Sequence, residues 1–126
     1  MPEIVYPSEY EQKVLMQEAP GGPPASVQLV IPSVTASGEP FDAHVAVLDE
    51  TGYPSLSCES VLKVKGIHTR PLHCRVSFVS GQPAVAVVRG ITIQEPGLHR
   101  LLAEMDEDAA FSNPTCCNEL LHDHIY

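Results

Sequence analysis

The segment 37–54 constrains the fold more than any other part of this sequence, because a period-two apolar pattern lies between two turn signals. Gly38 and Pro40 begin the segment, and Asp49, Gly52 and Pro54 close it. Between these turns every second residue is apolar, at Phe41, Ala43, Val45 and Val47. This alternation is typical of a β-strand with one buried face, and the closing residues favour a tight turn. The segment therefore predicts a strand within a β domain.

Short apolar stretches of the same kind recur along the chain. They span residues 26–31, 41–48, 58–64, 73–79, 84–88 (continuing or restarting at 90–93), 98–105 and 111–116. Twelve prolines and eight glycines fall between them, which favours many short strands over a few long helices. We therefore predict an all-β fold, an antiparallel immunoglobulin-like β-sandwich of seven or eight strands, and such a domain needs about 100 residues.

Residues 1–25 are predicted to form an irregular or short-helical leader. Ser8 and Glu11 have the spacing of a capping box, which favours a helix from Glu9 to about Gln17. Residues 13–16 would equally suit a short strand, and the Pro/Gly-rich segment 19–24 is typical of a linker. The predicted organisation is a leader at 1–25, the sandwich at 26–118 and a connector at 119–126 that runs towards an absent domain.

The charge distribution limits the classes of partner. The net charge of −9 argues against a nucleic-acid partner, since a phosphate backbone would be repelled. Six of the seven basic residues lie between residues 63 and 100, which indicates solvated strand faces or a small anion-binding face. The sequence contains no apolar run of transmembrane length and does not begin like a signal peptide, so no membrane partner and a cytoplasmic location are expected.

The four cysteines are expected to be thiols. If strands 58–64 and 73–79 pair as a hairpin centred near residue 69, Cys58 lies opposite residue 80 and out of disulfide reach of Cys74. Both are then expected to be buried as small apolar side chains. Cys116 and Cys117 are adjacent, so on a strand one is expected to be buried and the other exposed. No cysteine spacing matches a zinc site.

Histidines provide the candidate metal ligands. His122 and His124 are two residues apart, so on an extended segment both face the same way, with Cys116, Cys117 and Glu119 nearby. His68 and His73 share a second stretch with Cys74, and there a metal or anion site competes with an ordinary polar loop. His44 alternates with the apolar positions of its strand, so its side chain is expected on the polar face, at the surface.

No catalytic motif is visible. The sequence lacks a nucleophile elbow, a phosphate-binding glycine loop and a zinc-protease helix. The acidic residues at 104–108 are consecutive, which indicates a solvated hairpin end. We therefore expect no catalytic residue and no cofactor site in this chain.

Four segments carry a resemblance to a known family. Residues 36–41 and 45–54 are similar to the Gly-Glu-x-Phe opening and the Asp-x-x-Gly-Asn-Pro turn of bacterial immunoglobulin-like and filamin-like domains, with Tyr53 in place of the usual Asn. Residues 95–101 are similar to the Pro-Gly turn before the sixth strand of those domains. Residues 112–114 match the closing strand of a narrower group, a bacterial family of unknown function. In that family a PHP-type metallohydrolase-like domain follows the sandwich.

This resemblance implies a function for the chain. The second domain of the family opens with Ile-Tyr-Trp-Gly-Asp-x-His-x-His, and this chain closes on His124, Ile125 and Tyr126. The resemblance implies a non-catalytic accessory module that packs on the downstream domain through these three residues. Any divalent metal and hydrolase activity would then belong to the downstream domain.

Two alternatives stay open. One is a free-standing module that binds protein or carbohydrate, although the absence of Trp and the scarcity of Tyr disfavour sugar stacking. The other is a small metal-binding domain that uses the C-terminal histidines and cysteines. The sequence does not predict an oligomeric state.

Overall fold

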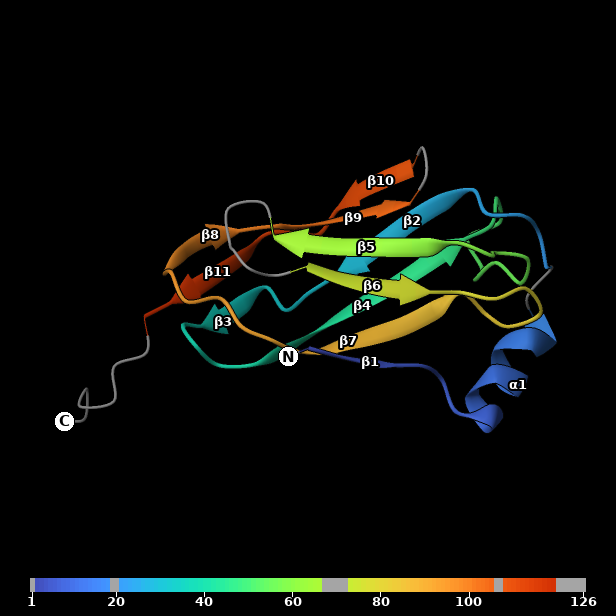
Figure 1. The fold of residues 1–126 in the computed structure, drawn as a ribbon, viewed down its shortest axis with the longest axis horizontal. Helices are drawn as coiled ribbons and strands as arrows, with labels where there is room; N and C mark the ends of the chain where they lie inside the picture. The colour runs from blue at the N-terminus through green and yellow to red at the C-terminus, as the bar shows by residue number, and fades with distance from the viewer. Residues whose placement is uncertain (1, 19–20, 67–72, 106–107, 120–126) are drawn as a thin grey trace.

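The structure is a computed structural model that describes residues 2–18, 21–66, 73–105 and 108–119. Over these residues the chain forms eleven strands and one helix, arranged in three sheets (Figure 1). The elements are β1 (Glu3–Val5), α1 (Glu9–Glu18), β2 (Ser26–Val30), β3 (Val34–Ala36), β4 (Phe41–Leu48), β5 (Val61–Gly66), β6 (His73–Ser77), β7 (Val85–Ile91), β8 (Gly97–His99), β9 (Leu101–Met105), β10 (Asp108–Phe111) and β11 (Thr115–Asn118).

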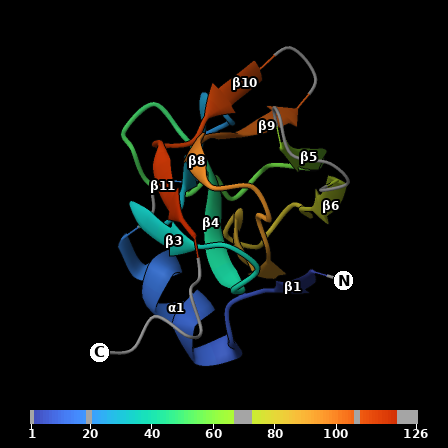
Figure 2. The same ribbon diagram turned by 90° about the vertical axis from the view of Figure 1, so that its left-hand side faces the viewer.

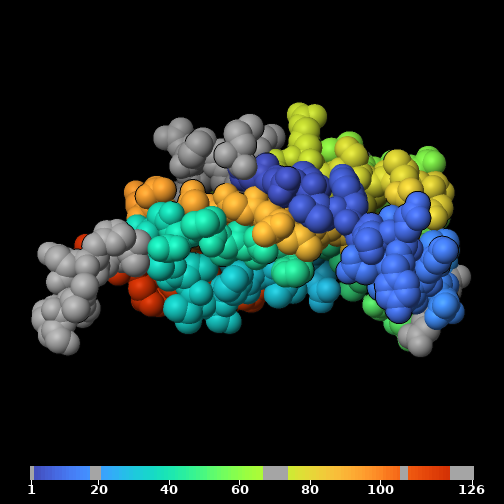
Figure 3. Space-filling model, turned by 90° about the horizontal axis from the view of Figure 1, so that it is seen from below, coloured from blue at the N-terminus to red at the C-terminus, as the bar shows by residue number. Residues whose placement is uncertain are grey.

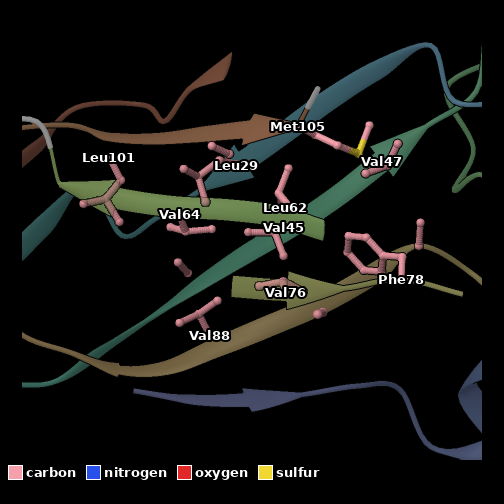
Figure 4. Packing of buried hydrophobic residues seen from close by; sticks show 14 of the residues in the cluster. Leu29, Val45, Val47, Leu62, Val64, Val76, Phe78, Val88, Leu101 and Met105 are labelled. Carbon is pink, nitrogen blue, oxygen red and sulfur yellow. The ribbon is translucent and has the colours of Figure 1, made fainter. Parts of the chain in front are cut away.

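Two antiparallel four-stranded sheets form the sandwich. The first has the order β1-β7-β4-β2 and the second the order β10-β9-β5-β6. Alternate side chains of both sheets point inward and interdigitate (Figure 4), including Leu29, Val45, Leu62, Val64 and Leu101. Because each such side chain contributes about 1.5–3 kcal/mol when fully buried, this core is the main source of stability.

The third sheet closes one end of the sandwich. It has the order β3-β11-β8, and β11 runs parallel to β3 and antiparallel to β8. In Figure 1 this sheet lies at the opposite end of the molecule from α1, and Figure 2 views it directly. The described chain leaves this end through Asn118 and Glu119. We call it the exit end, and we call the other the helix end.

The structure confirms the fold class predicted from the sequence. β4 has the bounds expected for its strand, and Ala43, Val45 and Val47 are buried on one face. β5 and β6 pair around residue 69, since Val61 lies opposite Ser77 and Lys65 opposite His73. The expected hairpin register is therefore correct.

Three strand predictions were wrong in detail. The strand expected from Cys58 begins at Val61, so Cys58 lies before it. The strand expected over 98–105 is split, and its halves β8 and β9 join different sheets. The strand expected over 111–116 is also two strands, since residues 112–114 connect β10 to β11. The cause in both split strands is a change of sheet, which period-two patterning does not reveal.

The N-terminal segment contains the expected helix and an unexpected strand. α1 covers Glu9–Glu18, and its start has the capping box, with Ser8 N–H donating to Glu11 Oε1 at 3.0 Å and Glu11 N–H to Ser8 Oγ at 3.2 Å. β1 pairs with β7 at the edge of the first sheet. Whether the chain divides at residue 25 stays a prediction.

Candidate binding surfaces

The exit end is held together by polar side chains. Asn113 connects the β10–β11 link to the end of β2, since its Oδ1 accepts from Ile31 N–H at 2.9 Å and its Nδ2 donates to Ile31 O at 2.8 Å. The hydroxyl of Ser112 accepts from Leu101 N–H at 2.9 Å, and Thr115 donates to Thr35 at 3.2 Å. These hydrogen bonds fix where the chain crosses from the second sheet to the third.

Two turns meet around the end of β11. Ser37 N–H donates to Asn118 O at 2.7 Å, and Gly38 N–H donates to Ile93 O at 2.9 Å. Gly38 has a φ of 77°, a backbone conformation that side chains with a Cβ rarely adopt. Nearby, Nε2 of buried His99 lies 2.7 Å from Glu95 O, while its Nδ1 has no hydrogen-bond partner among the described residues.

A row of exposed apolar side chains crosses the third sheet, and we call Val34, Leu98 and Cys116 the exit row. Cys116 lies opposite Val34 on one side and Leu98 on the other. Val34 is 63% exposed and Leu98 73% exposed, and Cys116 is also exposed. Adjacent exposed apolar side chains on a sheet mark a candidate interaction surface.

The helix end carries a second apolar surface. A groove of about 600 Å³ lies between α1 and the outer face of the first sheet, and we call it the helix groove. Figure 3 views this side of the molecule, where β1 and α1 lie beside β7. Its walls include Tyr6, Tyr10 and Val14, and its floor includes Ala46 and Val85. Its size lies within the usual range of about 300–1,000 Å³ for small-molecule sites.

The start of α1 is attached to the sandwich through Tyr6. The Tyr6 hydroxyl donates to Ser77 O at 2.8 Å and accepts from Ser77 N–H at 3.2 Å. It thereby satisfies the outward backbone groups of the edge strand β6 and connects the two sheets. Farther along, α1 leaves apolar side chains uncovered, with Tyr10 76% and Val14 47% exposed.

A charged turn closes the strand β4 at the helix end. Asp49 Oδ1 accepts from Thr51 N–H at 2.9 Å, from the Thr51 hydroxyl at 2.6 Å and from Tyr53 N–H at 3.1 Å. The Thr51 hydroxyl is the largest cause that lowers the pKa of the Asp49 carboxyl. The predicted turn after the second strand is therefore an Asp-centred turn.

The burial of the cysteines is as the sequence predicted for Cys58, Cys116 and Cys117, but not for Cys74, which was expected to be buried. All four lie in the described part of the chain and none forms a disulfide; Cys58 and Cys117 are buried and Cys116 is exposed. Cys74 is only partly buried, and this burial raises the pKa of its thiol. Cys58 Sγ lies 3.8 Å from Met105 Sδ inside the core.

Most of the candidate histidine ligands lie outside the part of the chain that the structure describes. His122, His124, Ile125 and Tyr126 lie outside the described residues, as do His68 and Arg70. Within the described ranges, no group of three or more His, Cys, Asp or Glu side chains is placed to hold a metal ion. His44 is exposed on the outer face of β4, as expected.

Three of the basic residues, Lys63, Lys65 and Arg75, lie on the outer face of the second sheet. Lys63 is directly opposite both Arg75 and Glu104, and Lys65 forms an ion pair with Glu104 at 2.6 Å. The hydrogen bond from Lys65 is the main cause that lowers the pKa of Glu104. This arrangement fits solvated strand faces.

Neither apolar surface was found by sequence reasoning. The exit row depends on three strands of three or four residues, which are too short to show a period. The helix groove depends on β1, which was not predicted. One signal was available, since the almost wholly apolar run 84–88 places apolar side chains on both faces of β7, including the outward Val85 and Val87.

The fold is that of an immunoglobulin-like β-sandwich domain. No protein-family model matches the chain, and neither does any curated protein. In the described part of the chain, no helix is long and apolar enough to cross a membrane.

Solved structures provide the comparisons. The chain is similar to the CARDB domain of a Pyrococcus furiosus protein in complex with di-metal ions, with a TM-score of 0.52 and 18% identity over 77% of this chain and 96% of that one. It is also similar to superoxide reductase (neelaredoxin) from Ignicoccus hospitalis, with a TM-score of 0.50 and 12% identity over 75% and 82% of the two chains. At these identities the likeness shows the fold alone.

Proposed function

We propose that this chain is a non-catalytic β-sandwich module that packs, through its exit row, on a domain that follows it in the same polypeptide. The observation that carries the proposal is the position of the exit row. Cys116 lies at its centre on β11, which ends at Asn118. Whatever follows β11 in the chain therefore starts beside an exposed apolar surface.

The resemblance supports the same arrangement. Of the segments that carry it, 36–41, 95–101 and 112–114 lie around the exit end, where they form its turns and links, whereas 45–54 follows β4 to the helix end. In the family that they resemble, a PHP-type metallohydrolase-like domain follows the sandwich. A divalent metal and a hydrolase reaction would belong to that domain, and we propose a cytoplasmic location.

The energy available from the exit row suits such an interface. Covering Val34 and Leu98 would contribute about 1.5–3 kcal/mol for each fully buried side chain. Specific interfaces bury about 800 Å² on each partner, so the exit row would form the apolar centre. Exposed Asn118 and Glu119 would contribute to its polar rim.

Thiol alkylation tests this proposal directly, because Cys116 is the exposed cysteine. In the 126-residue chain Cys116 should react faster than Cys117 and Cys58. In a longer polypeptide that includes the sequence after residue 126, its reaction should slow about tenfold or more, which corresponds to about 1.4 kcal/mol of packing. A Met16→Cys reporter on α1 should react equally in both proteins.

Two results would overturn the proposal. One is equal reactivity of Cys116 in the short and long polypeptides. The other is a gene in which no further domain follows residue 126.

A further inference from the structure

The floor of the helix groove is a two-row apolar surface that crosses the first sheet. Cross-strand register places Val5 opposite Val87, Val87 opposite His44, and His44 opposite Val30. The second row joins Gln28, Ala46 and Val85 in the same way. These positions alternate with the buried core positions, so the sheet presents apolar side chains on both faces.

The wall of the groove leaves this floor open. The segment before α1 is attached to the sandwich through Tyr6, yet Tyr10 and Val14 on the helix remain exposed. A ten-residue helix is only marginally stable without packing. A ligand in the groove would cover both the helix and the floor.

The polar groups of the groove select the charge of a ligand. Among the described residues that line it, Glu11 is the acid, His44 is the one basic side chain, and no Lys or Arg is present. The backbone N–H of Ser8 is the main cause that lowers the pKa of the Glu11 carboxyl, which is therefore ionised at neutral pH. The rings of Tyr6 and Tyr10 add aromatic surface, which attracts cations.

We propose that the helix groove binds a small apolar molecule that carries one positive charge. Its apolar part would lie on Ala46, Val85 and Val87, and its cationic group would lie towards Glu11. The net charge of −9 adds a general attraction for cations and disfavours a second copy of the chain as the occupant. This site is independent of the exit row.

The test uses two probes with one alkyl tail and opposite charges, decyltrimethylammonium and decyl sulfate, both below their micelle-forming concentrations. Each is titrated into the isotope-labelled 126-residue chain and followed by NMR. The cation should shift the amide signals of Gln28, Ala46 and Val85 and should bind at least about tenfold more tightly, a difference of about 1.4 kcal/mol.

Variants separate this site from general adsorption to an acidic protein. Ala46→Phe should fill the groove and abolish binding, whereas Leu98→Ala at the exit end should leave it unchanged. Glu11→Gln keeps a capping-box residue and should remove the preference for the cation. In each variant, unchanged signals from the core residues Leu62 and Val64 report that the sandwich is folded.

Three outcomes would overturn the proposal. They are equal or tighter binding of the sulfate, signal changes spread over other surfaces, and binding by Ala46→Phe equal to that of the natural chain.

Discussion

The two ends of the sandwich are closed by different chemistry. At the exit end, hydrogen bonds from Asn113, Ser112 and Thr115 hold three short strands in place, and an apolar row is displayed on the outside. At the helix end, one tyrosine connects a locally capped helix to the sandwich, beside an apolar groove.

This difference shows how one fold can present two kinds of surface. Buried polar groups are costly unless each has a partner, so a hydrogen-bonded end has one defined arrangement. That suits a permanent neighbour in the same polypeptide. At the helix end, exposed hydrogen bonds from Tyr6 connect the segment before α1 to the sandwich, and apolar side chains of α1 stay exposed, which suits a ligand that binds and leaves.

The largest effect is expected from Asn113→Ala at the exit end. It removes the partners of both Ile31 backbone groups, and each unsatisfied buried group costs about 1–3 kcal/mol. We expect a loss of about 2–4 kcal/mol in the free energy of unfolding, measured by urea denaturation. Asn118→Ala is the matched control, because the Asn118 side chain is exposed on β11. It should change the free energy of unfolding by less than about 0.5 kcal/mol. Equal effects of the two variants would contradict the role of Asn113.

A smaller and local effect is expected from Ser8→Ala at the helix end. Loss of the N-cap destabilises a helix by about 1 kcal/mol. Amide hydrogen exchange should accelerate in α1 and stay unchanged in β4 and β5. If amide hydrogen exchange accelerated equally in all elements, the helix end would not unfold separately from the rest of the sandwich, and the prediction would be wrong.

Tyr6→Phe is expected to have a still smaller effect. Ser77 lies at an exposed edge, so water can replace the lost hydroxyl, and the cost should be about 0.5–1 kcal/mol. Hydrogen exchange should accelerate at Ser77 and in β1. Tyr53→Phe is the control, because the Tyr53 hydroxyl has no hydrogen-bond partner among the described residues. Equal exchange at Ser77 in both variants would contradict the bridge.

The smallest effect at neutral pH is expected from Asp49→Asn, since Asn can accept the same hydrogen bonds in this turn. The effect should grow on acidification. The folded pKa of Asp49 lies below the ordinary Asp value of about 4, so the unfolded state takes up the proton first as the pH falls. The natural chain should therefore lose stability as the pH drops from about 4 through the lowered folded pKa. Urea denaturation at neutral and acidic pH should show a weaker acid dependence for Asp49→Asn.

Periodicity was sufficient to predict the sandwich but not its ends. The pattern of Ala43, Val45 and Val47 predicted β4 with its correct buried face, because a half-buried strand must alternate. The capping box at Ser8 and Glu11 predicted α1, since a cap is local chemistry. The hairpin that was supposed for the strands now labelled β5 and β6, centred near residue 69, is the pairing that the structure has.

The candidate surfaces could not be predicted, because they are set by contacts between distant segments. β3 and β11 are parallel neighbours separated by most of the chain, and no local pattern encodes that pairing. Likewise, nothing in residues 3–5 reveals that they add an edge strand to β7. The predicted interface residues His124, Ile125 and Tyr126 lie outside the described residues and stay a prediction.

The most direct test of the account is to add the separately produced domain that follows residue 126 to the isotope-labelled chain and record which amide signals change. We predict changes at Val34, Leu98 and Cys116, with Gln28, Ala46 and Val85 unaffected. Changes confined to the helix groove, or no change at saturating concentrations, would contradict the assignment of the exit row as the surface that packs on a neighbouring domain.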